Sequence, residues 1–464
     1  MSRLPQTILA WMLVLAAAHT AAAQMPIPLP DFSQYKVPDT VNPPARPVAS
    51  EYLDLAVLVV GLSLASYLAL VRRSRRGLFL LAIASLAWFG FWRQGCICPI
   101  GAIQNVSLAA ADPTYVVPLT VVGFFTLPLV FTLFFGRTFC AAVCPLGAVQ
   151  ELVAVRPVRV PTWLDHALGL LAYVYLGAGV LFAATGTAFL ICRYDPFVGL
   201  FRRNGSVNML LLGAGFLVLG IFVGRPYCRY LCPYGAVLGL LSKVSKWHVQ
   251  IPPEECIRCR LCEDVCPYGA IHEPTVPQPA AERPRARRRL AALIVALPLL
   301  VAAGAWLGTR LETPLARLNP TVRLAEQIRQ EQTGEAKGTT DASDAFRNTG
   351  RSMAGLYRDA MRLSGRFAVA GGWFGAWVGL VVGVKLIHLS VRRRRADYQP
   401  DRTGCVSCGR CFWYCPSEQA RLGLIQDVFI ADACTAEASG QLTKTTELIQ
   451  DVPIADASTS DKNT

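Results

Sequence analysis

The sequence predicts a mainly α-helical fold, a polytopic membrane helix bundle with about seven spans after a signal peptide and a small cysteine-rich domain on the cytoplasmic side. Three observations predict it. Of the 464 residues, 53% are hydrophobic and only 16% are charged, whereas soluble domains carry roughly 25% charged residues. The hydrophobic residues gather in seven long runs, and many of the 16 cysteines gather in repeated motifs. The net charge of +14 is typical of cytoplasmic loops in a membrane protein, and no nucleic-acid partner is expected.

Residues 1–24 have the pattern of a secretory signal peptide. Arg3 precedes an apolar stretch over residues 8–18, and Ala21 and Ala23 fit a small-residue cleavage site. An uncleaved membrane anchor is the alternative. In either case residues 25–50 form a periplasmic segment.

Seven apolar runs, most of them near the 20 residues that a span needs, follow at 52–71, 77–93, 116–136, 164–191, 207–224, 290–308 and 367–389. Basic clusters alternate with them, at 72–76, 156–159, 243–246, 283–289 and 392–395. Because positive charge stays in the cytoplasm, these clusters predict a multi-pass protein of the bacterial inner (cytoplasmic) membrane.

The predicted organisation is a five-span membrane domain at 51–250, half of a cytoplasmic domain at 251–282, a sixth span at 283–308, a periplasmic loop at 309–365, a seventh span at 366–391, the second cytoplasmic half at 392–425 and a polar tail at 426–464. The periplasmic loop has apolar residues at roughly helical spacing, which favours an amphipathic surface helix. A docking site for a periplasmic partner is the alternative.

Two cysteine runs share the pattern C-x2-C-x2-C-x3-C-P, at 256–267 and 405–416. This spacing is typical of bacterial ferredoxins, in which three cysteines bind one [4Fe-4S] cluster and the fourth binds the other. Zinc is the alternative, although zinc sites usually use two separated pairs. The expected ligand sets are Cys256, Cys259, Cys262 and Cys415 for cluster 1, and Cys405, Cys408, Cys411 and Cys266 for cluster 2.

Two spans separate these runs, yet the charge pattern places both runs in the cytoplasm, where thiols stay reduced. The two spans therefore act as a hairpin that brings the halves together. We expect one ferredoxin-like domain that is split by a membrane insertion.

The pattern C-P-x-G-A recurs at Cys98, Cys144, Cys232 and Cys266. Two copies extend to C-x3-C-P, which predicts a further redox or iron–sulfur site. If each pair lies on one helix, its two sulfurs share a face. The residues of this expected site are Cys140, Cys144, Cys228 and Cys232. The alternative is that these are helix-ending turns with inert thiols.

The alternation of spans places Cys96, Cys98 and Cys192 on the opposite, outer side. Three thiols there could form a disulfide with one left over, or could bind a metal together with a non-cysteine ligand. A quinol site near Arg193, Tyr194 and Asp195 is a weaker alternative to a simple bend. A b-type haem on His166 and His388 is weaker still.

Two span-terminal C-x3-C-P motifs followed by ferredoxin runs resemble the NosR/NapH-type membrane polyferredoxins, and the resemblance covers roughly residues 50–416. It is closer to NosR, because the second run stands beyond a hairpin. The resemblance implies ligation of clusters by the eight cysteines of the two runs and a redox role for the C-x3-C-P cysteines. The chain departs from NosR in lacking a periplasmic FMN-binding domain before the first span, so no covalent FMN is expected.

The function expected from these features is membrane electron transfer, between a quinol or a cytoplasmic donor and a periplasmic flavoprotein, cytochrome or reductase, in nitrous-oxide or nitrate respiration. The chain would then be an electron-transfer component or a quinol dehydrogenase-like subunit. It would hold two [4Fe-4S] clusters. A further iron–sulfur centre and a quinone are additional cofactors that the sequence leaves open. The alternatives are a redox-dependent assembly or regulatory factor for a copper enzyme, and a redox sensor.

Overall fold

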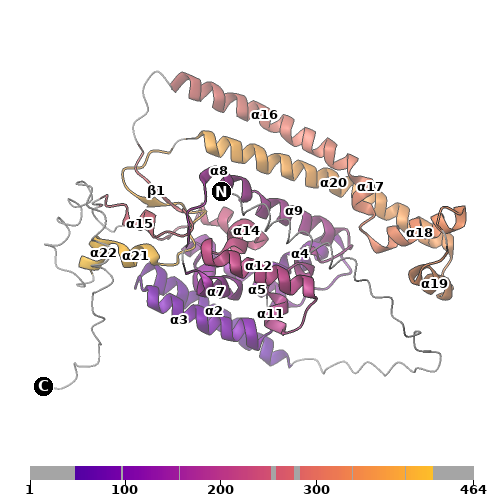
Figure 1. Cartoon of the computed structure of the whole chain (residues 1–464), viewed down its shortest axis with the longest axis horizontal. Coiled ribbons are helices and arrows are strands. Elements are labelled where there is room, and N and C mark those ends of the chain that lie inside the picture. The colour runs from indigo at the N-terminus through magenta and orange to yellow at the C-terminus, as the bar shows by residue number, and fades with distance from the viewer. Residues whose placement is uncertain are drawn as a thin grey trace, which may run out of the picture. The chain divides into compact units, whose positions relative to one another are not determined.

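The computed structural model describes residues 47–95, 98–155, 157–251, 256, 258–275, 283–336, 338–391 and 393–421. The predicted signal peptide, most of the predicted periplasmic segment at 25–50 and the polar tail lie outside these residues, as do Cys96 and Cys434. In the described part, helices make up nearly all of the regular structure, with one two-stranded sheet (Figure 1). The prediction of a mainly α-helical fold is therefore confirmed.

Among the described residues, four helical segments are long and apolar enough to cross a membrane. They are α2 (Val48–Leu70), the continuous pair α8 and α9 (Thr162–Leu168 and Leu171–Ala184), α16 (Arg283–Arg310) and α20 (Met353–Ser390). Shorter apolar helices are α5 (Leu119–Phe135), α12 (Val207–Phe222) and α14 (Pro233–Ser242). The run at 77–93 forms α3 (Arg75–Ser85) and a π-helix, η1 (Leu86–Trp92). All seven apolar runs are thus helical, while seven spans and their orientation stay predictions.

Short helices connect these segments, and several cysteines lie in them or directly before them. Their bounds are α4 (Pro99–Ala111), α6 (Thr138–Ala142), α7 (Pro145–Val153), α10 (Leu190–Arg193), α11 (Val198–Arg202), α13 (Pro226–Tyr230), α15 (Leu261–Asp264), α17 (Glu312–Ala316), α18 (Pro320–Thr333), α19 (Asp341–Asn348), α21 (Arg410–Tyr414) and α22 (Pro416–Arg421). Helices α4, α7 and α14 each have a cysteine at the N-cap and a proline directly after it. Proline suits that position because the first helical N–H needs no partner within the helix.

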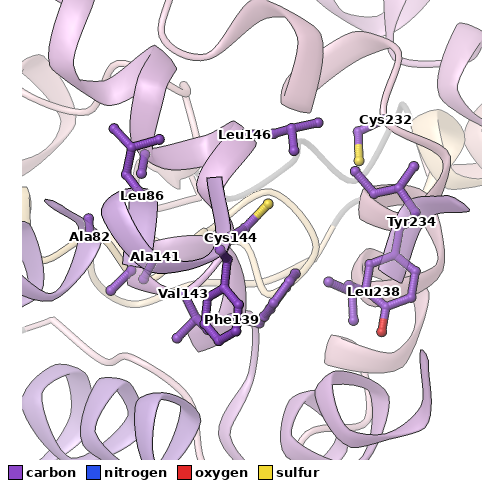
Figure 2. Close-up of a cluster of buried hydrophobic side chains, with 14 of the residues drawn as sticks. Ala82, Leu86, Phe139, Ala141, Val143, Cys144, Leu146, Cys232, Tyr234 and Leu238 are labelled. Atoms are coloured by element: carbon purple, nitrogen blue, oxygen red, sulfur yellow. The ribbon is translucent and has the colours of Figure 1, made fainter. Parts of the chain in front are cut away.

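The main core lies among α2, α3, α6, α7 and α14, with Leu62, Val143 and Leu238 fully buried. Two cysteines of the C-x3-C-P motifs, Cys144 and Cys232, belong to this core. Figure 2 shows their sulfur atoms among the apolar side chains. The motifs therefore lie inside the helix bundle.

Helices α16 and α20 form a closely packed hairpin (Figure 1). Its contact consists of facing glycines, namely Gly304 and Gly308 on α16 and Gly371, Gly375 and Gly379 on α20. A Cβ at Gly371 would lie only 2.6 Å from the carbonyl oxygen of Gly308. Small residues allow membrane helices to approach this closely. The Trp377 indole N–H of α20 donates to the Tyr173 carbonyl of α9 at 2.8 Å and so joins the hairpin to the bundle.

The predicted periplasmic loop is a folded helical segment. Ile328 of α18, Phe346 of α19 and Leu356 of α20 pack into one small core, which agrees with the amphipathic pattern expected there. Helix α20 begins at Met353, capped by the Ser352 side chain, whereas the last apolar run begins at 367. The apolar run marks only the later part of this helix, because its first three turns are amphipathic and pack on α18 and α19.

Candidate iron–sulfur centres

The two cysteine runs meet in space because a short antiparallel sheet joins them. Strand β1 (Ile271–His272) pairs with β2 (Gln399–Pro400), with Ile271 opposite Pro400. The Asp401 N–H donates to the Ala270 carbonyl at 2.6 Å, and α15 contacts α21. Residues on both sides of the α16–α20 hairpin thus form one small domain.

The two runs also share an unusual backbone conformation. Arg258 and Arg260 have φ values of 56° and 63°, and Ser407 and Gly409 have 56° and 75°. These are the third and fifth positions of each run. Left-handed conformations at non-glycine residues are uncommon and mark loops that are held by their surroundings. Each run therefore folds into the same loop around its second cysteine.

A first quartet of cysteines surrounds one pocket of about 300 Å³. Its cysteines are Cys256, Cys259, Cys262 and Cys415. Ile251, Arg258, Arg260, Tyr398 and Ser417 complete the lining. The fourth cysteine of the second run thus lies with the first three of the first run.

A second quartet consists of Cys266, Cys405, Cys408 and Cys411. Cys266 and Cys405 pack against Cys408 beside Tyr268 and Val406, and Cys411 interacts electrostatically with Cys405, Cys408 and Cys266. The fourth cysteine of the first run therefore lies with the first three of the second run. In this arrangement each quartet draws on both runs.

The chemistry of these thiols suits a metal cluster better than bare thiols. Burial raises the pKa of Cys262 and of Cys405 to about 12, so neither thiol ionises near neutral pH by itself. Positively charged iron stabilises thiolates and drives proton release when it binds. In the described part of the chain no three Cys, His, Asp or Glu side chains converge on a single-ion site.

The C-x3-C-P cysteines form a third quartet, Cys140, Cys144, Cys228 and Cys232. The expectation that each pair lies on one helix is wrong, because Cys140 lies in α6 and Cys144 is the N-cap of α7. Cys228 in α13 and Cys232 before α14 repeat this arrangement. The proline after each second cysteine starts a new helix, so each pair stands at a corner between two helices.

Two buried arginines, one before each C-x3-C-P motif, each reach the other motif. Arg225 lies close to Gly147 of the first motif, and Arg137 lies close to Gly235 of the second, with hypothetical Cβ distances of 3.0 and 3.3 Å. Arg225 donates to the carbonyls of Cys140 and Ala141. Each arginine stands three residues before the first cysteine of its own motif. The two motifs therefore contact each other through these two arginines.

Glu151 of α7 is a buried carboxylate that joins the third quartet to the second. It forms ion pairs with Arg75 at 2.5 Å, Arg410 at 2.8 Å and Arg225 at 3.0 Å, and it accepts from the Tyr268 hydroxyl at 2.9 Å. Burial would raise the pKa of Glu151, but the guanidinium groups of Arg225, Arg410 and Arg75 outweigh it and hold the pKa well below its usual range. Glu151 is therefore ionised at neutral pH.

The three quartets are neighbours. Cys266 and Cys405 of the second quartet pack against the core around Cys262 and Cys415 of the first. Cys140 packs with Cys266 and Cys405 against the apolar cluster around Cys408. The order in space is thus first, second and third quartet, with the third in the helix bundle.

The sequence analysis missed several residues of this region, above all Glu151, Arg137, Arg225 and Gln150. The sequence signal that could have identified the two arginines is their position three residues before Cys140 and Cys228. Of the outer cysteines, Cys98 and Cys192 are free thiols. Arg193 and Tyr194 are exposed, and Asp195 is buried.

Comparisons with known proteins find two 4Fe-4S binding domain families. A 4Fe-4S binding domain family matches residues 117–170 and 206–252, each of which contains one C-x3-C-P motif. A second 4Fe-4S binding domain family matches residues 249–272, which contain the first ferredoxin run.

Curated relatives match parts of the chain. YccM of Escherichia coli is 30% identical over 118 residues, which are 23% of this chain and 33% of YccM. NirI of Paracoccus denitrificans is 29% identical over 203 residues, 42% of this chain and 24% of NirI. The regulatory protein NosR of Pseudomonas aeruginosa is 42% identical over 57 residues, 12% of this chain and 8% of NosR. The chain thus spans about a third or less of the length of these relatives. No solved structure matches.

Proposed function

We infer, from the premise that this chain is a membrane-associated 4Fe-4S polyferredoxin of the NosR/NirI type, that it conducts single electrons between the cytoplasmic face and the interior of the membrane. The observation that carries this proposal is the contact between the second and third quartets through Cys140, Cys266 and Cys405. Thiols from the small domain and from the helix bundle lie in one packed cluster there.

The proposed ligand sets are the three quartets. Cys256, Cys259, Cys262 and Cys415 would hold one [4Fe-4S] cluster, and Cys266, Cys405, Cys408 and Cys411 a second. Cys140, Cys144, Cys228 and Cys232 would hold a third iron–sulfur centre. Bound clusters would supply one-electron redox chemistry over a wide range of potential. The chain's own part is to bury the thiols, to orient them and to exclude water.

A centre in the third quartet would shorten the distance that an electron must cross in the membrane. A bilayer core is roughly 30 Å thick, which is too wide for one electron-transfer step from the small domain to the far side. Cys144 and Cys232 lie inside the helix bundle, so a centre there would shorten the remaining distance. Glu151 would keep the bundle and the small domain together at this junction.

The orientation and partners belong to the proposal as well. Basic clusters at 72–76 and 283–289 support a position of the small domain on the cytoplasmic side of a bacterial inner membrane. A quinol or a cytoplasmic reductant would be the donor, and a periplasmic flavoprotein, cytochrome or reductase the acceptor. The resemblance of the motifs to NosR/NapH-type polyferredoxins favours a role in nitrous-oxide or nitrate respiration.

The first test uses anaerobically purified full-length protein. After reduction with dithionite, we expect that a quinone analogue rapidly oxidises the centres, as followed by visible absorbance and EPR. Cys140→Ala should lower the iron content by one cluster and slow this oxidation, while Cys434→Ala serves as the control. An unchanged iron content and rate in Cys140→Ala would remove the third centre.

The alternative function, a redox-dependent assembly or regulatory factor, is favoured by the name of NosR as a regulatory protein. The same preparation separates the two functions. Rapid oxidation by quinone supports electron conduction, whereas reduction of added copper without oxidation by quinone supports assembly of a copper enzyme.

A further inference from the structure

Cys98 and Cys192 lie in a second copy of the framework that surrounds the third quartet. The segments Cys98-Pro-Ile-Gly-Ala-Ile-Gln104 and Cys144-Pro-Leu-Gly-Ala-Val-Gln150 correspond at every position in residue type. Both cysteines are helix N-caps with proline at the first helical position. Both glutamines are completely buried. Cys98 therefore holds the same local position as Cys144.

The two glutamines make the same pair of contacts. Gln150 accepts from the backbone N–H of Tyr227 at 3.1 Å and donates to the Cys228 sulfur at 3.1 Å. Gln104 accepts from the N–H of Ile191 at 2.5 Å and donates to the Cys192 sulfur at 3.5 Å. In both cases the N–H belongs to the residue directly before the cysteine. Cys192 thus holds the place of Cys228.

Cys192 lies close to α4, the helix that begins directly after Cys98, and contacts it at Gly101. A Cβ at this position would lie 3.1 Å from the Cys192 sulfur. Cys98 and Cys192 also interact electrostatically with each other and with Asp195. The two thiols and the carboxylate therefore lie in one neighbourhood.

Asp195 takes the place of the fourth cysteine. The chain continues as Cys192-Arg-Tyr-Asp195-Pro in one copy and as Cys228-Arg-Tyr-Leu-Cys232-Pro in the other. Asp195 is only 2% exposed, and its Oδ1 accepts from the N–H groups of Phe197 and Val198 at 2.9 and 3.2 Å. The Cys232 sulfur likewise accepts from the Gly235 N–H at 3.2 Å. A carboxylate thus replaces a thiol before the proline.

A buried hydroxyl between the two copies also indicates a missing group. Tyr227 is completely buried, and its Oη has no hydrogen-bond partner among the described residues. Its ring packs edge-on against Phe197, and its hydroxyl interacts electrostatically with Asp195, Cys232 and Cys98. Buried hydroxyls normally have a partner. The Tyr227 hydroxyl therefore lies close to both sites, so that a group bound at the third quartet or at Cys98 and Cys192 would be its neighbour.

We propose that Cys98, Cys192 and Asp195 hold a further iron–sulfur cluster, which is a carboxylate-containing counterpart of the third quartet. This inference rests on the proposed function, because only an iron–sulfur protein would load such a site. Cys192, Arg193 and Tyr194 are exposed, so this centre would lie where a partner can reach it. Cys96 lies outside the described residues and is not counted among the ligands.

The test measures iron, zinc and acid-labile sulfide together with EPR spectra of anaerobically purified full-length variants. Cys98→Ala and Cys192→Ala should each lose the iron and sulfide of the same one cluster, and the double variant should lose no more. Asp195→Cys should keep the iron content but change the EPR spectrum of that cluster, because a thiolate replaces a carboxylate oxygen. If the alanine variants fail to fold, the EPR spectrum of Asp195→Cys still tests the proposal. The matched control is Cys434→Ala.

Three results would overturn the inference. One is an iron content and spectrum in both alanine variants equal to those of the wild type. Another is zinc in place of iron, and the last is a Cys98–Cys192 disulfide in the anaerobic protein. The separate variant Cys256→Ala should lose one [4Fe-4S] cluster in any of these cases if the proposed function holds. A wild-type protein without iron would instead remove both proposals.

Discussion

The side-chain amide of Gln150 donates a hydrogen bond to the sulfur of Cys228 at 3.1 Å, from one C-x3-C-P motif to the other. Hydrogen bonds to cluster sulfurs are one of the main ways in which a protein tunes an iron–sulfur potential. The contact links α7 and α13, which are far apart in the sequence. Gln150 therefore holds the two motifs in register and influences the electronic properties of the centre that they would bind.

The first prediction concerns this contact. Gln150→Leu removes the donor, so the reduction potential of the third centre should fall while the iron content stays the same. EPR-monitored redox titration measures both. Gln104→Leu is the matched control, since Gln104 bonds to Cys192 instead, and it should leave the third centre's potential unchanged. Equal potentials in wild type and Gln150→Leu would show that this hydrogen bond does not influence the third centre.

The second prediction concerns Glu151. Glu151→Gln removes the carboxylate that neutralises Arg75, Arg225 and Arg410, which leaves buried cations without a counter-charge. Breaking a buried ion pair costs about 3–5 kcal/mol, so the thermal midpoint in detergent should fall clearly. Glu151→Asp is the control and should lose less stability. A midpoint for Glu151→Gln equal to that of wild type would contradict the role of this junction.

The third prediction concerns the exchange of the fourth cysteines between the two runs. Cys256 and Cys415 lie at the same pocket, so the double variant Cys256→Ala/Cys415→Ala should lose no more iron than either single variant. Cys256→Ala/Cys266→Ala should lose the iron of two clusters, because Cys266 lies in the second quartet. Iron and sulfide assays on the five proteins, wild type included, measure this. The opposite pattern would mean that each run binds its own cluster.

The fourth prediction concerns the glycine contact of the hairpin. A Cβ at Gly375 would collide with the backbone of Gly304 on α16, whereas one at Gly365 of the same helix meets nothing within 4 Å. Overpacking costs about 1–3 kcal/mol, so Gly375→Ala should lower the thermal midpoint. Gly365→Ala should be neutral or slightly stabilising, because alanine favours helix. Equal midpoints for the two variants would contradict close helix contact at Gly375.

Much of the fold could be predicted from local patterns. Apolar runs predicted the helices, whereas the Cys-Pro motifs, which were interpreted in one alternative as helix-ending turns, stand where helices α4, α7 and α14 begin. The start of α20 at Met353 was missed because its first turns are amphipathic and depend on contacts with Phe346. Glu151 was missed because its three arginines come from distant parts of the sequence, and such contacts leave no periodic signal. The break between Cys140 and Cys144 was missed because i, i+4 spacing alone does not show where a proline starts a new helix.

The most direct test of the central claim is the iron and sulfide content of anaerobically purified protein, together with the EPR spectrum after reduction. Two [4Fe-4S] clusters in the first and second quartets require about eight irons per chain, and further centres add to that number. Because the quartets are neighbours, we expect a spectrum broadened by spin–spin interaction between reduced clusters. A colourless, iron-free protein would contradict the account, as would an iron content that stays unchanged when Cys256 and Cys405 are both replaced by alanine.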